Sequence, residues 1–297
     1  NKESLGNIVL SIPASESQQG CIANILQTID EAIEKTEQLI EKYQQIKAGL
    51  MNDLFTRGIG ADGKLRPPRA QAPELYHKTP IGWIPRDWDC ELLDKVAVRG
   101  SGHTPSKSFP EYWDGGVKWI SSADSHRLDK LYISETQFEI SELGLQNSSA
   151  ILHPPGIVVL SRDAGVGKSA ITKAPMAVSQ HFMCWRCDEK RMHNVFLYYW
   201  LQHNKRYFEN IAMGSTILTI GLSYFKKLKI GVPSEFDEQK TIASSLLALE
   251  GKIFSMQSDL AKKKEVKSGL MHDLLTGKVS VSADLPVEPA SPEEGAA

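Results

Sequence analysis

The sequence lacks the features that would place it in a membrane or in an oxidising compartment. Its 297 residues contain no window approaching 18 consecutive apolar residues, and no signal peptide opens the chain, so we expect no membrane span. The chain has only four cysteines, and they are scattered apart from one close pair. This cysteine usage is typical of a reducing compartment, and we expect a soluble protein of the cytoplasm.

A strong charge of either sign is also absent. The formal net charge is −2, which by itself argues neither for nor against nucleic acid as a partner. The C-terminal tail, residues 280–297, is rich in Pro, Ala and Glu, which predicts disorder. From Ala283 onward it carries four acidic residues and no basic one, so the rest of the chain has 34 basic and 32 acidic residues. We therefore expect a mildly basic folded part.

Catalytic motifs are missing as well. We find no Ser/His/Asp triad, no paired catalytic carboxylates, no HExxH motif and no methyltransferase glycine motif. Residues 163–169 look like the end of a P-loop, but Arg162 stands where the full motif needs glycine, and Pro175 leaves no room for a following helix. We interpret the segment as a glycine-rich β-turn that carries Arg162, Lys168 and Ser169 outward, toward a DNA backbone or a base edge.

Two further short patterns each allow a structural interpretation. Cys184 and Cys187 form a lone CxxC pair, whereas zinc needs two more ligands at compatible spacing. In a strand, a spacing of three would point the two thiols to opposite faces, which favours a structural role. Residues 100–108 form a loop of small polar residues with His103 and Lys107, and 214–216 is a smaller version. Such loops are either solvated surface loops or loops that enter a groove.

The longest pattern in the chain is an internal repeat. The stretch from Pro13 to Thr56 recurs 220 positions later, without a gap, as Pro233 to Thr276. Agreement is best near the ends, where Gly-Leu-Met at 49–51 recurs at 269–271. An ungapped repeat at this separation is a property of the architecture and is considered before any local motif.

Each copy of the repeat predicts one long helix. Both follow a proline and an acidic or Ser-rich turn, and they end near Gly58 and Gly277. Apolar residues recur at steps of three and four, as in the seam of a coiled coil, over roughly 38 residues or about 57 Å. We expect the two helices, 13–57 and 229–279, to pair with each other; two helices packed on separate cores are the alternative. The seam positions are Ile22, Ile25, Ile29, Ile33, Ile40, Tyr43, Ile46, Leu50 and Leu54 in the first copy, and Ile242, Leu246, Leu249, Ile253, Met256, Leu260, Val266, Leu270 and Leu274 in the second.

Between the helices the composition changes twice. Residues 58–80 are punctuated by Gly and Pro, which predicts a linker with Lys64, Arg66 and Arg69 exposed. Residues 81–228 have a usual domain size, and five tryptophans from Trp83 to Trp185 suit a compact core. We predict a mixed α/β domain with a twisted sheet and long loops. The β-like runs are 117–120, 157–160, 177–178 and 182–185, and 195–203 has the pattern of a helix.

Five short motifs follow one another in a fixed order along the chain. They are Trp-Ile-Pro-x-x-Trp at 83–88, Gly-x-Thr-Pro at 102–105, Trp-Ile with a polar turn at 119–124, Ser-Arg plus Gly at 161–167, and Pro-x-x-x-x-Glu-Gln-x-x-Ile-Ala at 233–243, which leads into the second long helix. This order resembles the DNA-specificity subunit of type I restriction–modification enzymes, up to about Val281. The first repeat departs from the pattern, because Gln18-Gln19 stands where the second repeat has Glu238-Gln239.

The resemblance implies an α/β (α+β) target-recognition domain plus two long helices that form an antiparallel coiled coil. Such a subunit has two recognition domains, each reading one half of a bipartite site on double-stranded DNA, with the coiled coil as a ruler between them. It does no chemistry and needs no cofactor. Modification subunits use S-adenosylmethionine to methylate adenine, and restriction subunits, held through the methyltransferase, use ATP and Mg. The present sequence matches the central helix, the second recognition domain and the C-terminal helix.

Residues 1–12 look like the end of a preceding recognition domain. We expect that domain to be removed by truncation, or to be supplied by a second specificity chain as a dimer. Two other classes of protein stay open. One is a coiled-coil scaffold whose globular domain binds no DNA, and the other is an enzyme that uses the Gly-Lys-Ser loop on a nucleotide. The predicted DNA-binding residues are Ser101, His103, Thr104, Lys107, Arg127, Arg162, Lys168, Ser169 and Thr216, and no catalytic or metal site is expected.

Overall fold

The computed structural model describes residues 13, 15–163, 165–214 and 218–281, which divide into two compact units. The first comprises chain positions up to Ile46 together with those from Leu249, and the second is Lys47–Ala248. The expected end of a preceding domain (1–12), Thr216 and positions 282–297 of the expected tail lie outside the described residues. Among those described, no helix is long and apolar enough to cross a membrane.

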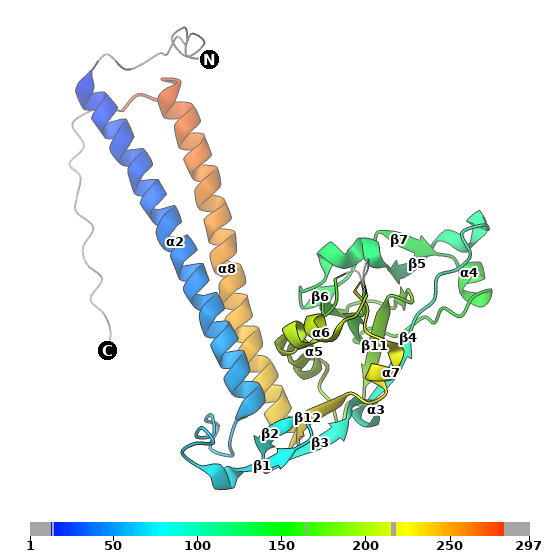
Figure 1. The fold of residues 1–297 in the computed structure, drawn as a ribbon. Coiled ribbons are helices and arrows are strands. Elements are labelled where there is room, and N and C mark those ends of the chain that lie inside the picture. Colours follow the sequence, from blue (N-terminus) through cyan, green and yellow to red (C-terminus); the bar gives the residue numbers. More distant parts are fainter. Residues whose placement is uncertain (1–12, 14, 164, 215–217, 282–297) are drawn as a thin grey trace. The chain divides into compact units, whose positions relative to one another are not determined.

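The first unit is an antiparallel pair of helices. Helix α2 (Glu16–Thr56) and helix α8 (Phe236–Leu275) are the two predicted long helices, and Figure 1 shows them side by side. Lys267 Nζ lies 2.5 Å from the Asp30 carboxylate, and Lys264 Nζ lies 2.6 Å from that of Glu37. Further along α2, Tyr43 stacks under Lys252. Residues that come later in α2 thus contact residues that come earlier in α8, so the predicted coiled coil is confirmed as antiparallel.

The seam between these helices is partly as predicted. Ile22, Ile40, Ile253 and Leu274 are buried. The expectation is wrong for Ile46 and Val266, which are exposed, because a 3.6-residue helical turn drifts away from a strict heptad. Buried Thr36 takes a seam position instead and accepts a hydrogen bond of 2.8 Å from Lys263 Nζ. The pairing therefore contains one polar layer among aliphatic ones.

The second unit is a mixed α/β domain, as the sequence predicts, but its strands form several small sheets rather than a single one. A five-stranded sheet has the order β4-β11-β8-β9-β6, and a three-stranded sheet has the order β10-β5-β7. Two antiparallel two-stranded sheets, the local pair β1-β2 and the long-range pair β12-β3, complete the strands described. The strands are β1 (Tyr76–Thr79), β2 (Gly82–Pro85), β3 (Trp88–Leu92), β4 (Ala97–Ser101), β5 (Trp113–Ile120), β6 (Tyr132–Ile133), β7 (Phe138–Ile140), β8 (Val158–Ser161), β9 (Ser169–Thr172), β10 (Ala177–Val178), β11 (Phe182–Cys187) and β12 (Lys229–Pro233). The shorter helices are η1 (Pro73–Leu75), α3 (Leu93–Val96), η2 (Pro110–Tyr112), η3 (Ser122–Arg127), α4 (Glu142–Gln146), α5 (Asn194–His203), α6 (Lys205–Ile211) and α7 (Leu222–Phe225).

The inner strands β8 and β11 are buried on both faces of the five-stranded sheet, over Val158–Ser161 and 182–185, which explains why they read as apolar runs. Along β11, Phe182 and Cys184 face one core cluster, while Met183 and Trp185 face another. The second cluster contains the apolar side of α5 and the inner ends of both long helices. There Phe55 of α2 packs edge-on against Phe196 of α5, with ring centroids 5.2 Å apart. The domain core thus takes in the ends of α2 and α8.

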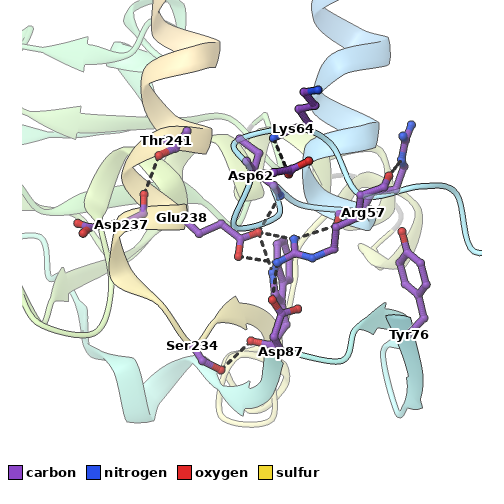
Figure 2. Close-up of polar contacts among 12 residues, drawn as sticks. Arg57, Asp62, Lys64, Tyr76, Asp87, Ser234, Asp237, Glu238 and Thr241 are labelled. Atoms are coloured by element: carbon purple, nitrogen blue, oxygen red, sulfur yellow. Dashed lines mark hydrogen bonds and ion pairs between the residues drawn. The ribbon is translucent and has the colours of Figure 1, made fainter. Parts of the chain in front are cut away.

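The predicted exposure of Arg66 is wrong, and segment 58–80 is more ordered than a linker, since it contains η1 and β1. Arg66 is only 8% exposed, because three acceptors surround it. Its guanidinium donates to Glu238 at 2.7 and 3.0 Å, to Asp87 at 2.5 Å and to the Arg57 carbonyl at 3.1 Å. Figure 2 shows the Glu238 and Asp87 side chains converging on this point. Burial alone would lower the pKa of Arg66, but the two carboxylates outweigh it and raise that pKa.

Glu238 also ties three segments of the domain together. Besides Arg66, it accepts from the Ile59 backbone N–H at 2.8 Å and from Trp88 Nε1 at 3.0 Å. Gly58, with φ of +64°, closes the end of α2 at this point, and a Cβ there would lie 2.4 Å from Glu238 Oε1. The neighbouring Gln239 is buried and bonds the backbone of Arg191 and His193. The Glu-Gln pair that opens α8 is therefore a structural anchor of the domain.

Candidate nucleic-acid interface

Two connections between the sheets meet at one place. The loop after β4 leads from the five-stranded sheet to β5 of the three-stranded sheet, and the turn at 179–181 leads back from β10 to β11. The two segments touch where His103 N–H donates to the Val178 carbonyl at 3.1 Å. Gly102 is required here, because a Cβ would lie 1.6 Å from that carbonyl oxygen. This contact brings the predicted loop at 100–108 against the turn.

A pocket of about 560 Å³ lies at this junction, and we call it the junction pocket. Its walls are aromatic, with Trp113 and Trp119 edge to face at 5.2 Å, and its rim is polar. Apolar walls with a few convergent polar groups are typical of a binding site. Its lining residues are Thr104, Lys107, Trp113, Asp114, Trp119, Ser121, Ser122, Ala123, Phe138, Gln180 and His181.

Three residues that line the junction pocket, Thr104, Gln180 and His181, form a chain of polar contacts with Asp163, which lies behind them. The Asp163 carboxylate lies 2.8 Å from His181 Nδ1, and His181 Nε2 lies 3.5 Å from Gln180 Nε2. Thr104 Oγ1 donates to Gln180 Oε1 at 2.5 Å. Asp163 is buried, whereas the Gln180 amide is exposed. The chain thus begins in the interior and ends at the surface.

Arg162 stabilises the turn at 179–181 through its guanidinium group. Its Nη1 donates to the Gln180 carbonyl at 3.1 Å, and its Nε donates to the Ile220 carbonyl at 3.0 Å. The structure therefore brings three of the predicted residues together: Thr104, Lys107 and Arg162. Lys107 is exposed, but Arg162 is half-buried and spends these two donors on the protein backbone. The position of Arg162 favours a supporting role for the turn.

Lys168 and Arg127 belong to a neighbouring group around η3. Lys168 Nζ donates to both the carbonyl and the hydroxyl of Ser125 at 3.1 Å. Arg127 Nε lies 3.4 Å from the carboxylate of Asp124, which caps the start of η3. Ser122 and Ala123 of η3 line the junction pocket, so this group adjoins it. Ser101 and His103 are exposed at the end of β4 and just after it.

The expectation that the glycine-rich turn carries Ser169 outward is wrong. Ser169 is fully buried at the start of β9, and its hydroxyl accepts a hydrogen bond of 2.8 Å from Gln202 Nε2. The turn itself lies before Ser169 and contains Gly165 and Gly167, both with positive φ. The chain then continues as a strand, as expected from Pro175, so no helix N-terminus faces this turn. Thr216 lies outside the described residues.

Gln180 and His181 were not among the residues predicted from the sequence to bind DNA. They lie between two buried runs, 177–178 and 182–185, that were predicted as strands. A polar pair between two apolar strands marks a turn, and that signal was available. What the sequence could not indicate is that this turn meets the loop at 100–108, because the contact is between segments about 76 residues apart.

The two cysteines of the CxxC pair take the opposite faces predicted for them. Cys184 packs in one core cluster and Cys187 against the other. Burial raises the pKa of each thiol to about 12, so both stay protonated near neutral pH. Among the described residues, no group of three or more His, Cys, Asp or Glu side chains is arranged to hold a metal ion.

The junction pocket, with aromatic walls and a few convergent polar groups, has the character of a binding site. Residues 85–265 match the family described as the type I restriction modification DNA specificity domain. Since this match spans more than half of the chain, the chain belongs to that family.

The chain is similar to several specificity subunits of type I restriction enzymes. It is 28% identical over 201 residues to the MjaIX specificity subunit of Methanocaldococcus jannaschii, covering 67% of this chain and 44% of that protein. It is 25% identical over 283 residues to the putative MjaX specificity subunit of the same organism, covering 95% and 61%. The chain thus spans less than two thirds of the length of these relatives, 44% of the first and 61% of the second.

Solved structures have the same fold. The HsdS subunit from Thermoanaerobacter tengcongensis has a TM-score of 0.58 at 14% identity, covering 94% of this chain and 63% of that one. A chain from a structural study of complex assembly in the type I R-M system has a TM-score of 0.61 at 17% identity, covering 94% and 64%. These likenesses concern the fold alone.

Proposed function

We propose that this chain is a non-catalytic DNA-specificity component of a type I restriction–modification complex. Its domain reads one half of a bipartite site on double-stranded DNA, and its paired helices set the distance to the other half. The observation that carries this proposal is the junction pocket, where Thr104, Lys107, Gln180 and His181 converge on an exposed rim in a chain of this family. Hydrogen-bonding side chains on a rigid rim suit base edges, and an exposed lysine beside them suits phosphate.

The proposal assigns different roles to the predicted residues. Lys107 contacts phosphate, and the 179–181 turn, which Thr104 supports through its hydrogen bond to Gln180, acts at the base edge. Arg162 and Lys168 hold that turn and η3 in place, because their donors are used on the Gln180, Ile220 and Ser125 carbonyls. Ser101, His103 and Arg127 make further contacts to the DNA backbone in this proposal. Ser169 has no place in such an interface, because it is buried.

The internal repeat supports a second recognition domain at the other end of the coiled coil. In the second repeat, Glu238 and Ile242 anchor the domain. Their equivalents in the first repeat, Gln18 and Ile22, line a groove of about 230 Å³ together with Leu274, the equivalent of Leu54. A second domain, from a longer polypeptide or from a second specificity chain, would dock there. The paired helices would then hold a recognition domain at each end through equivalent residues of the two repeats.

The chemistry of the complex belongs to other chains in this proposal. A methyltransferase subunit that uses S-adenosylmethionine would bind the coiled coil and the nearby domain surface. Restriction subunits that use ATP and Mg would be held through it.

The test is adenine methylation across a genome, with this chain and its cognate modification subunit expressed together and each alone. A bipartite methylated motif that needs both proteins is the expected result. A palindromic motif would indicate two copies of this domain, and an asymmetric one a second, different domain. A stable complex without new methylation would favour the coiled-coil scaffold that binds no DNA.

Replacing Lys107 with alanine is expected to weaken DNA binding alike for all sequences. Because one phosphate contact is lost, the slope of log affinity against log salt should fall by about 1, with the melting temperature unchanged. Binding would be titrated by fluorescence anisotropy over a salt series, using the complex with the modification subunit. Lys78→Ala, an exposed lysine in β1, is the matched control and should leave the slope unchanged. If Lys107→Ala, Arg162→Ala and Lys168→Ala all bind as the wild type does, these loops do not form the interface.

A further inference from the structure

The side-chain amide of Gln180 is held in one orientation by its neighbours. A carboxylate only accepts hydrogen bonds, so the Nδ1 atom of His181 must donate to Asp163, at 2.8 Å. In the neutral imidazole, Nε2 is then an acceptor, and it faces Gln180 Nε2. On the other side, Thr104 Oγ1 donates to Gln180 Oε1. Both contacts specify the same amide orientation, with oxygen toward Thr104 and nitrogen toward His181.

The backbone under this amide is fixed as well. Arg162 Nη1 donates to the Gln180 carbonyl, and the Arg162 backbone N–H donates to the His181 carbonyl at 3.0 Å. Asp163, at the base of the chain, is only 7% exposed. An exposed amide on such a support loses little conformational entropy when it binds a ligand.

The groups that remain on the amide define what it can bind. One lone pair of Oε1 and one N–H of Nε2 are left over after the contacts to Thr104 and His181. Acceptor and donor lie side by side, and in the major groove this pair matches the N6 amino group and N7 of adenine. We propose that Gln180 is a specificity-determining residue that reads an adenine in the half-site, with Asp163, His181 and Thr104 as positioning residues. The proposal rests on the proposed function, because it needs the junction pocket to face duplex DNA.

The experiment compares methylation motifs for the chain co-expressed with its modification subunit. In Gln180→Glu the N–H donor becomes an acceptor at constant size, so adenine should be lost at one position of the half-site and cytosine, a donor at N4, favoured. In Gln180→Ala the same position should become degenerate, with discrimination falling roughly 5- to 150-fold, the loss of one bidentate pair. Gln71→Ala, an exposed glutamine in segment 58–80, should leave the motif unchanged.

The outcomes separate this inference from the proposed function. If the wild-type chain gives no motif, the proposed function fails. If it gives a motif that both Gln180 variants preserve at every position, Gln180 is a structural link and the inference is overturned. Where a Gln180 variant fails to fold, Thr104→Val removes one orienting contact and leaves the amide in place. Relaxation at a single position then supports the inference, and an unchanged motif overturns it.

Discussion

Replacing Glu238 with alanine is expected to lower the free energy of unfolding by about 3–5 kcal/mol, the usual effect of removing one partner of a buried ion pair. The change leaves the buried Arg66 guanidinium with a single carboxylate partner, Asp87, which is largely exposed. It also removes the acceptor of Trp88 Nε1 and of the Ile59 N–H. Urea unfolding followed by far-UV circular dichroism would measure the difference at constant m-value.

The matched control is the preceding residue. Asp237 has the same charge, but its side chain is 88% exposed, and its contact with Lys240 is a surface pair within one helical turn. Asp237→Ala should therefore change stability by no more than about 0.5 kcal/mol. Glu238→Gln should fall between the two, since it keeps an acceptor for Trp88 and loses the charge. Equal destabilisation by Asp237→Ala and Glu238→Ala would show that the helix N-terminus, rather than the buried cluster, carries the effect.

The cluster also shows what the sequence could and could not predict. The repeat predicted both helices, because a periodic apolar pattern is a local property that does not depend on distant residues. Two strands of the five-stranded sheet, β8 and β11, were predicted from their apolar runs, whereas β4, β6 and β9 were not. Arg66 was placed in a solvated linker, because no local pattern indicates that Asp87 and Glu238, 21 and 172 residues away, will surround it.

The candidate site was predictable only in part, for the same reason. Polar loops at 100–108 and at 163–169 were identified from composition, and Thr104 and Lys107 do line the junction pocket. Composition does not tell which residue of a turn faces outward, so Ser169 was assigned to the surface although it is the first residue of a buried strand. Gln180 becomes a candidate only once the turn at 179–181 is seen against Thr104. Specificity in this domain depends on contacts between sheets, which sequence order hides.

Replacing Trp185 with alanine is expected to destabilise the domain by about 3–5 kcal/mol, as is usual when a large aromatic side chain is removed from a core. Trp185 is fully buried on β11 and packs edge-on against Phe225, with ring centroids 5.9 Å apart. The sequence treated the tryptophans from Trp83 to Trp185 as one group suited to a core, but their burial differs widely. Trp83 on β2 is 45% exposed and stacks under Arg69.

Trp83→Ala is therefore the control for the Trp185 variant, with an expected loss of about 0.5–1 kcal/mol, the value of an exposed cation–π contact. Far-UV circular dichroism is the appropriate probe, because both changes remove a fluorophore. β11 begins at Phe182, directly after the turn that carries Gln180, so a loosened strand should also weaken DNA discrimination in Trp185→Ala. Trp83→Ala should keep the wild-type methylation motif. Similar unfolding midpoints for the two variants would contradict the assignment of Trp185, rather than Trp83, to the domain core.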